Sequence, residues 1–149
     1  MRLVVQRSLN SSVSVEGSAI GVIEKGLVVL VGFTYGDTIQ DIQYCVNKLV
    51  HLRIFDDENG VMNKSILDQG GSVLSISQFT LYASTEKGNR PNYMAALPSN
   101  EASELYDMWN AELSKYVKVE TGRFGADMKV SITNDGPVTI LIESRDKND

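Results

Sequence analysis

The sequence contains few of the residues that most often carry catalysis or bind metals, with one cysteine and one histidine among 149 residues. The lone Cys45 excludes an internal disulfide and any zinc site built from several cysteines, and it favours a reducing compartment. His51 belongs to no pattern typical of a Ser-His-Asp triad or a Cys-His pair. We therefore expect His51 to be structural, and we expect no metal and no cofactor.

Long hydrophobic runs are also absent. No apolar run approaches the roughly 20 residues that a helix needs to span a bilayer. The chain meets charge early, in Met-Arg-Leu-Val-Val-Gln-Arg, whereas a signal peptide has a longer apolar segment. We expect a soluble, cytoplasmic protein that does not associate with membranes.

Positive charge is scarce, with 14 Lys and Arg against 19 Asp and Glu and a net charge of −5. This balance argues against a nucleic-acid partner, because phosphate binding usually depends on a basic surface. A local cluster can still dominate its surroundings within a Debye length of about 8–10 Å. Lys87 and Arg90, in the polar segment 84–92, are therefore candidates for contact with an anionic ligand.

Apolar residues, at 42% of the chain, are sufficient for one core. We expect a single domain over residues 1–149, with a charged and frayed end at 143–149. Strand patterns occur at 2–6, 13–15, 18–24, 26–34, 72–83, 117–121, 128–133 and 140–142. Helical spacing of apolar residues covers about 37–52, where Asp37 and Gln40 resemble a capping box, and 98–116.

The order of these segments predicts an α+β fold. We expect a mostly antiparallel, barrel-like mixed sheet with two main helices packed outside it. The Leu27–Val31 run is long enough for a strand that is buried on both faces. Asn59-Gly60, between apolar residues, predicts a hairpin.

The segment 75–83, Ser-Ile-Ser-Gln-Phe-Thr-Leu-Tyr-Ala, carries the first functional signal. If it is a strand, Gln78 and Thr80 lie on one face, together with Ile76 and Tyr82. Buried polar side chains require polar partners or a ligand. The segment is therefore the candidate floor of a binding site.

Two turn-like segments follow in the second half of the chain. Gly122-Arg-Phe-Gly-Ala126 is bounded by glycines and presents one cation and one aromatic ring. Asn134-Asp-Gly-Pro137 is typical of a hairpin turn, because each of its residue types favours turns for conformational reasons. Spacing alone does not distinguish a turn from a functional loop here.

Two motifs together indicate a family. Ser77-Gln-Phe-Thr-Leu81 and Asn134-Asp-Gly-Pro-Val-Thr139 resemble the motifs of the D-aminoacyl-tRNA deacylases. The resemblance begins at Met1-Arg-Leu-Val-Val-Gln-Arg7 and includes Gly122-Arg-Phe-Gly-Ala-Asp-Met128. It covers nearly the whole chain, with the motifs in the right order.

The resemblance implies a cytosolic homodimer that hydrolyses the ester between a D-amino acid and the 3′ end of tRNA. It implies that Gly136-Pro137 is a cis peptide, inserted into the partner's pocket as a main-chain filter against L-aminoacyl groups. Because glycine has no side chain to exclude, glycyl-tRNA is expected to be accepted too. Arg7 would hydrogen-bond to the Gly136-Pro137 loop and brace it.

The same resemblance assigns the pocket residues. Ser77, Gln78, Phe79 and Thr80 would line the pocket, and the last three would take part in catalysis. Phe124 and Ala126 would form its rim. Lys87 and Arg90 are assigned to tRNA phosphates from charge and position, without a motif.

Two mechanisms remain open from the residues. Thr80 could be the nucleophile, but a threonine hydroxyl needs an adjacent base, and the sequence shows none. Alternatively, water or the neighbouring ribose 2′-OH attacks while backbone N–H groups bind the developing oxyanion. We favour the second mechanism; a different Thr-dependent hydrolase or a non-catalytic nucleic-acid-binding module are the competing classes.

Overall fold

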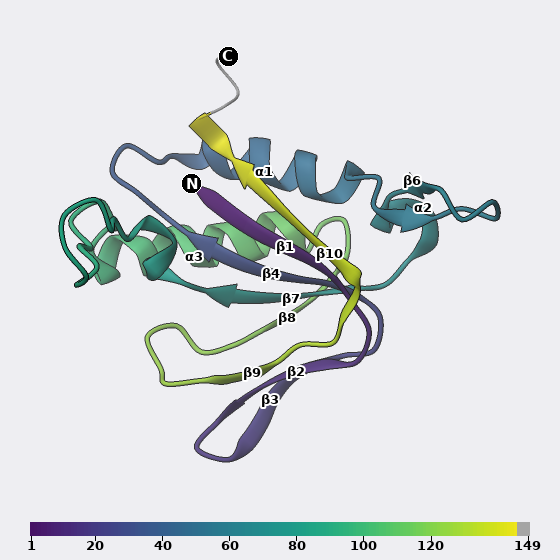
Figure 1. The fold of residues 1–149 in the computed structure, drawn as a ribbon, viewed down its shortest axis with the longest axis horizontal. Coiled ribbons are helices and arrows are strands. Elements are labelled where there is room, and N and C mark those ends of the chain that lie inside the picture. The colour runs from purple at the N-terminus through teal and green to yellow at the C-terminus, as the bar shows by residue number, and fades with distance from the viewer. Residues whose placement is uncertain (146–149) are drawn as a thin grey trace.

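A five-stranded sheet forms the centre of the computed structural model, which describes residues 1–145. Its strand order is β10-β1-β4-β7-β8. The bounds are β1 Arg2–Ser8, β4 Gly26–Gly32, β7 Ser72–Ser77, β8 Lys118–Thr121 and β10 Asn134–Glu143. Helices α1 (Ile39–His51) and α3 (Ser99–Leu113) cover one face of this sheet (Figure 1).

Strand β4 lies at the middle of the sheet and is buried on both faces, as its apolar run predicts. Leu27, Val29 and Val31 join the core beneath the helices, whereas Val28 joins a second cluster on the opposite face. Two neighbours shield its edges: β1 pairs with it antiparallel and β7 pairs with it parallel. The strand therefore joins the antiparallel pair β1–β4 to the parallel pair β4–β7 within the central sheet.

A smaller sheet of order β3-β2-β9 covers part of the opposite face. It comprises β2 (Ser11–Val15), β3 (Ser18–Ile23) and β9 (Lys129–Ser131). Val13 and Ile23 from this sheet pack against Leu74 and Ile76 of β7. In Figure 1 this sheet lies below the central one and leaves β1 and β10 uncovered on that side.

Helix α1 begins one residue later than the predicted capping box implies. The capping box is formed by Thr38 and Asp41, because Thr38 N donates to Asp41 Oδ2 at 2.9 Å. Asp37 instead accepts from the N-terminal ammonium at 2.7 Å. The apolar spacing of the two long helices is confirmed, with Leu49 of α1 and Trp109 of α3 fully buried.

The predicted hairpin at Asn59-Gly60 is confirmed by β5 (Phe55–Asp56) and β6 (Met62–Lys64). Asp57 stabilises the turn, because its Oδ1 accepts the N–H groups of Asn59 and Val61. These bonds lower the pKa of Asp57, and the bond from Val61 has the largest effect. The short helix α2 (Ile66–Gln69) follows directly.

The fold is mixed α+β with two main helices, as predicted, but its sheet is open rather than barrel-like. The β4–β7 and β7–β8 pairs are parallel. They are parallel because α1 lies between β4 and β7, and α3 between β7 and β8, and each helix returns the chain to the same end of the sheet. Strands β8 and β10 are left as the two edges.

The predicted frayed end, residues 143–149, starts too early in the chain. Glu143 is the last residue of β10, and the buried Ser144 donates its N–H to Met1 O at 2.9 Å. Arg145 donates to Tyr35 O at 2.8 Å. These contacts attach residues 143–145 to the start of the chain, and residues 146–149 lie outside the described part.

Candidate functional site

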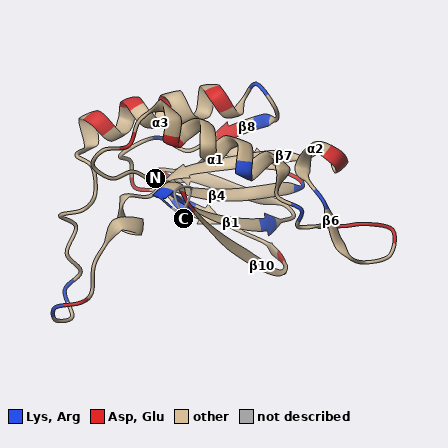
Figure 2. Ribbon diagram, turned by 90° about the horizontal axis from the view of Figure 1, so that it is seen from above, with Lys and Arg blue, Asp and Glu red and all other residues tan. Residues whose placement is uncertain are grey.

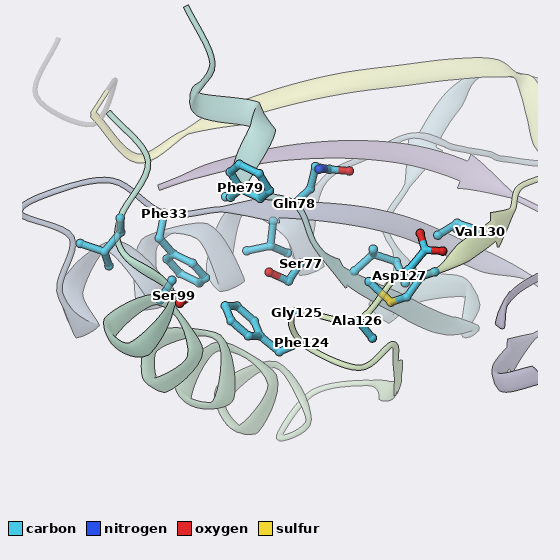
Figure 3. A pocket seen from close by; sticks show the side chains of 16 residues that line it. Phe33, Ser77, Gln78, Phe79, Ser99, Phe124, Gly125, Ala126, Asp127 and Val130 are labelled. Atoms are coloured by element: carbon cyan, nitrogen blue, oxygen red, sulfur yellow. The ribbon is translucent and has the colours of Figure 1, made fainter. Parts of the chain in front are cut away.

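A cavity of about 520 Å³ opens where β7 ends. Most of its lining is apolar, and it comes from β4, β7, the start of α3 and the segment before β9 (Figure 3). The lining residues are Val31, Gly32, Phe33, Ile76, Ser77, Gln78, Phe79, Leu97, Ser99, Ala102, Phe124, Gly125, Ala126, Asp127, Met128 and Val130. Sequence-predicted Ser77, Gln78, Phe79, Phe124 and Ala126 are thus brought together in one place.

The predicted strand 72–83 is wrong in its second half. Strand β7 stops at Ser77, and Phe79–Tyr82 form a 3₁₀ helix, η1. Gln78 N still donates to Val31 O of β4, but beyond it the bonds are local: Leu81 N donates to Gln78 O and Ala83 N to Thr80 O. The alternating pattern is therefore no guide to which of these side chains share a face.

Gly32, at the end of β4, allows η1 to pack close to the sheet. A Cβ on Gly32 would lie 3.0 Å from Gln78 O and 3.0 Å from Leu81 Cβ. Any larger residue would have to push η1 away from the sheet. Gly32 is a site residue that the sequence reasoning missed, and its place at the end of a buried strand was the available signal.

Thr80 is exposed and is not among the residues that line the cavity. Its hydroxyl oxygen accepts a hydrogen bond from Gln78 Nε2 at 2.6 Å. The one histidine, His51, lies at the end of α1, where its Nδ1 is 2.8 Å from Asn47 O. The contact described for the Thr80 hydroxyl is thus with an amide donor, which cannot act as a base for a threonine nucleophile.

Phe79 lies at the open side of the cavity, with 55% of its surface exposed. Its ring stands edge-on to that of Tyr93, with centroids 5.2 Å apart. Phe124 faces it from the opposite wall in Figure 3. The cavity therefore has aromatic groups on two sides.

Charge is sparse in the cavity. Asp127 is the one ionisable side chain in the lining, and it is 92% exposed and 3.2 Å from Lys129 Nζ. Across residues 1–145, no three His, Cys, Asp or Glu side chains are grouped so that they could hold a metal ion. Besides that carboxylate, the polar side chains in the lining are the hydroxyls of Ser77 and Ser99 and the amide of Gln78.

The segment Asn134–Thr139 is part of β10 rather than a hairpin turn. It bulges from the sheet, because Gln6 pairs with Thr139 whereas Ser8 pairs with Asn134. Asn134 Oδ1 accepts from Val138 N at 2.8 Å across the bulge. The Gly136-Pro137 peptide within it is cis.

Arg7, which is 12% exposed, holds one side of this bulge. Its Nε donates to Asp135 O at 2.8 Å, and its Nη1 donates to Ile54 O at 2.9 Å. A Cβ on Gly136 would lie 3.1 Å from Arg7 Nη2 and 2.8 Å from Val138 Cγ2. The bulge and the guanidinium are therefore fitted closely to each other.

Besides Thr80, two groups of predicted site residues do not line the cavity. Gly136 and Pro137 are exposed and do not line the cavity of their own chain. Lys87 and Arg90 lie on the exposed loop between η1 and α3, which the Ser84–Asn92 bridge closes. Figure 2 shows basic residues at the tip of the long loop before α3.

Ser99 and Ala102 are site residues that the sequence reasoning also missed. They lie in the first turn of α3 and line the cavity opposite β7. Their spacing on one helix face was visible in the sequence. The face on which the cavity lies depends on how α3 packs on the sheet, which the sequence does not show.

The fold and the cavity define a class: a small α+β protein with a mostly apolar pocket at the end of a parallel strand, without a nucleophile–base pair among its lining residues. A model of the family described as D-Tyr-tRNA(Tyr) deacylase matches residues 4–143. The chain belongs to that family, which confirms the resemblance seen in its two motifs.

Curated relatives agree with this assignment. A D-aminoacyl-tRNA deacylase of Bacillus pumilus (strain SAFR-032) is 56% identical over 147 residues, covering 98% of this chain and 100% of the relative. One of Thermus aquaticus is 53% identical over 148 residues, covering 99% of this chain and 97% of the relative.

Two solved structures share the fold. One is described as c-Myc DNA Unwinding Element Binding Protein, with a TM-score of 0.91, 40% identity and coverage of 96% of this chain and 98% of that chain. The other, described as a probable eukaryotic D-amino acid tRNA deacylase, has a TM-score of 0.81 and covers 95% of this chain and 97% of that chain. Because it is only 16% identical, it shows the fold alone.

Proposed function

We propose that this protein hydrolyses the ester bond of D-aminoacyl-tRNA in the cavity at the end of β7, releasing free amino acid and tRNA. The observation that supports it most directly is that residues 77–79 of the first motif line a cavity of aminoacyl size. Membership of the family supplies the substrate class. The reaction requires no metal or cofactor, since the ester is intrinsically labile.

The proposed mechanism relies on positioning and on backbone donors. The first N–H groups of a helix have no partner within the helix, and in η1 these belong to Phe79 and Thr80. They are the candidate donors to the oxyanion that forms when water adds to the ester carbonyl. The bond to the ribose 3′ oxygen then breaks, and that oxygen leaves with a proton.

The role proposed for the Thr80 hydroxyl is to orient Gln78 rather than to attack the ester. The oxygen accepts from Gln78 Nε2 at 2.6 Å, which fixes the amide at the cavity wall. The ribose 2′-OH of the terminal adenosine is adjacent to the scissile ester and is a better-placed group to hydrogen-bond the attacking water. In this proposal Gln78 contributes its oriented side-chain amide, and Phe79 and Thr80 contribute backbone N–H groups.

We further propose that two copies of the chain form each complete site. Gly136 and Pro137 project as an exposed bulge and lie outside the cavity of their own chain. The uncovered face of β1 and β10 beside them carries Leu141, which is 70% exposed. A second copy docked on that face would bury Leu141 and bring its Gly136-Pro137 bulge to the cavity.

Chiral selection in this arrangement comes from main chain. L- and D-aminoacyl groups exchange hydrogen and side chain at one carbon, so the filter must fill the place of the L side chain. Gly136 has no Cβ, which permits the close approach of backbone to substrate. Glycyl-tRNA has no side chain for the filter to exclude, so it is accepted as well.

The tRNA body is proposed to meet the loop that carries Lys87 and Arg90, because phosphates favour Lys and Arg. This reaction belongs in the cytoplasm, where charged tRNA is used. In the described chain, no helix is sufficiently long and apolar to cross a bilayer.

A deacylation assay on D-Tyr-tRNA, L-Tyr-tRNA and Gly-tRNA tests the proposal. We expect rapid release from the D and glycyl esters and little from the L ester. Hydrolysis of the L ester at the D rate would overturn the filter. Binding of tRNA without turnover of any ester would favour a nucleic-acid-binding module, and activity unaffected by uncharged tRNA would favour a different ester hydrolase.

A further inference from the structure

Ser75 is a fully buried residue of β7, one position before the strand reaches the cavity. Its carbonyl oxygen accepts two hydrogen bonds, from the Tyr106 hydroxyl at 2.7 Å and from Gly122 N at 3.3 Å. Its own hydroxyl oxygen accepts from Trp109 Nε1 at 3.1 Å. One residue therefore joins β7, helix α3 and the start of the 122–126 segment.

These bonds link the two walls of the cavity. On one side, Ile76 and Ser77 follow Ser75 directly and line the cavity. On the other side, Phe124 and Ala126 follow Gly122 and form the facing wall. The separation of the walls thus depends on the groups that meet at the Ser75 carbonyl.

Tyr106, in helix α3, contacts both of these walls. Its hydroxyl bonds to Ser75 O, and its ring lies against that of Phe124 with centroids 5.9 Å apart. Tyr106 is 3% exposed and is not itself part of the cavity lining. Burial raises the pKa of its phenol, so the hydroxyl remains protonated and able to donate.

We propose that Tyr106 is a positioning residue for deacylation, which acts by fixing the strand end that carries Ser77 and Gln78 relative to the ring of Phe124. This inference rests on the proposed function, because it takes the cavity as the place where the ester reacts. A shift of about 1 Å between catalytic groups can cost about 100-fold in rate. Loss of the hydroxyl bond therefore acts on the chemical step rather than on tRNA affinity.

The test is Tyr106→Phe, which keeps the ring and its contact with Phe124 and removes only the hydroxyl. We expect kcat for D-Tyr-tRNA to fall roughly 10-fold, with KM changed less than about threefold. Amide exchange at Gly122 is measured in the same variant and is expected to quicken. Circular dichroism melting establishes that the variant is folded.

Two controls separate positioning from stability. Trp109→Phe removes a buried bond to the Ser75 side chain but leaves the Ser75 carbonyl bonds; we expect a lower Tm with kcat within twofold. Tyr116→Phe makes the same chemical change at an exposed tyrosine and is expected to alter neither quantity. If Tyr106 had a structural role alone, kcat would change in neither Tyr106→Phe nor Trp109→Phe.

If the kcat of Tyr106→Phe stays within twofold of the kcat of the unchanged protein, the inference is wrong. Gln78→Ala, assayed in parallel, distinguishes this failure from failure of the proposed function. If Gln78→Ala loses activity while Tyr106→Phe does not, only the positioning role is wrong. If both retain full activity, the cavity is not the site of deacylation.

Discussion

The hydroxyl of Thr80 shows how local geometry can reverse the role that a residue type suggests. A threonine in a motif invites assignment as a nucleophile, yet its oxygen receives a hydrogen bond from Gln78 Nε2. Nucleophilic attack would require a base to take the hydroxyl proton. At the scale of single residues, we therefore expect catalysis to rely on hydrogen-bond donors and shape rather than on an activated nucleophile.

Replacing Thr80 with alanine tests this assignment. We expect kcat to fall by less than about 10-fold, because Gln78 loses its anchor but the η1 backbone donors remain. The same assay with a D-aminoacyl-tRNA ending in 2′-deoxyadenosine is expected to show the larger loss. A fall of several orders of magnitude in folded Thr80→Ala, with normal turnover of the deoxy substrate, would identify Thr80 as the nucleophile.

Gly136 is the residue where backbone freedom matters most. Its φ of +137° lies in a region that L side chains rarely adopt, and a Cβ would lie 2.8 Å from Val138 Cγ2. We expect Gly136→Ala to destabilise the protein by about 1–3 kcal/mol from backbone strain. We also expect it to lower deacylation more than 10-fold, because the bulge must move to admit the methyl group.

Gly17→Ala is the matched control for that experiment. Gly17 also has a positive φ, +81°, but nothing lies within 4 Å of its Cβ position. The control should lose stability without losing activity, as measured by urea unfolding and by deacylation. Equal activity loss in both variants would mean that the bulge has no specific part in the reaction.

At the scale of elements, η1 and the loop after it connect the cavity to the surface. The strand ends at Ser77 because the chain turns into η1, and this turn places Phe79 at the opening of the cavity. The following loop contains Lys87 and Arg90, and Figure 2 shows the long loop before α3 extending away from the sheet. Chemistry and tRNA contact are therefore assigned to neighbouring but separate elements.

Reversing charge on this loop tests the second assignment. We expect the double variant Lys87→Glu, Arg90→Glu to raise KM about 10-fold or more for D-Tyr-tRNA while kcat stays within about twofold. The salt dependence of KM should become weaker, because fewer counterions are released on binding.

Lys48→Glu reverses charge on the distant helix α1 and serves as the control. Its KM is expected to stay close to that of the unchanged protein. An unaltered KM in the loop double variant as well would remove the loop from the tRNA-binding surface.

At the scale of the whole molecule, the uncovered face of β1 and β10 exposes an apolar side chain to solvent. The small sheet covers β7 and the middle of β4 but not Leu141, which is 70% exposed on the outer strand. An edge strand with an exposed apolar face is a surface that tends to associate. The proposed second copy would cover it.

Leu141→Asp tests that association. A carboxylate cannot be buried against an apolar partner without a large desolvation cost, so we expect a monomer in analytical ultracentrifugation and deacylation reduced more than 10-fold. Val61→Asp, at a residue 57% exposed in the β5–β6 hairpin, is the control and should leave both unchanged. A fully active monomer of the Leu141 variant would exclude a site shared between subunits.

The sequence by itself determined the family, the two motifs, the long helices and the doubly buried β4, because apolar periodicity and local turn chemistry are encoded within short segments. Through the resemblance it also predicted that Ser77, Gln78, Phe79, Phe124 and Ala126 lie around one pocket, and all five line the cavity. The error at residues 78–83 arose because alternation of side chains does not reveal where a strand stops.

Only the tertiary structure decided the open sheet, the Ser75–Tyr106 link and the separation of Gly136 from its own cavity. Each depends on contacts between segments far apart in the chain, such as Arg7 with Asp135 or Gly32 with Gln78. Those contacts are set by how helices and strands pack, and packing is a property of the folded chain as a whole.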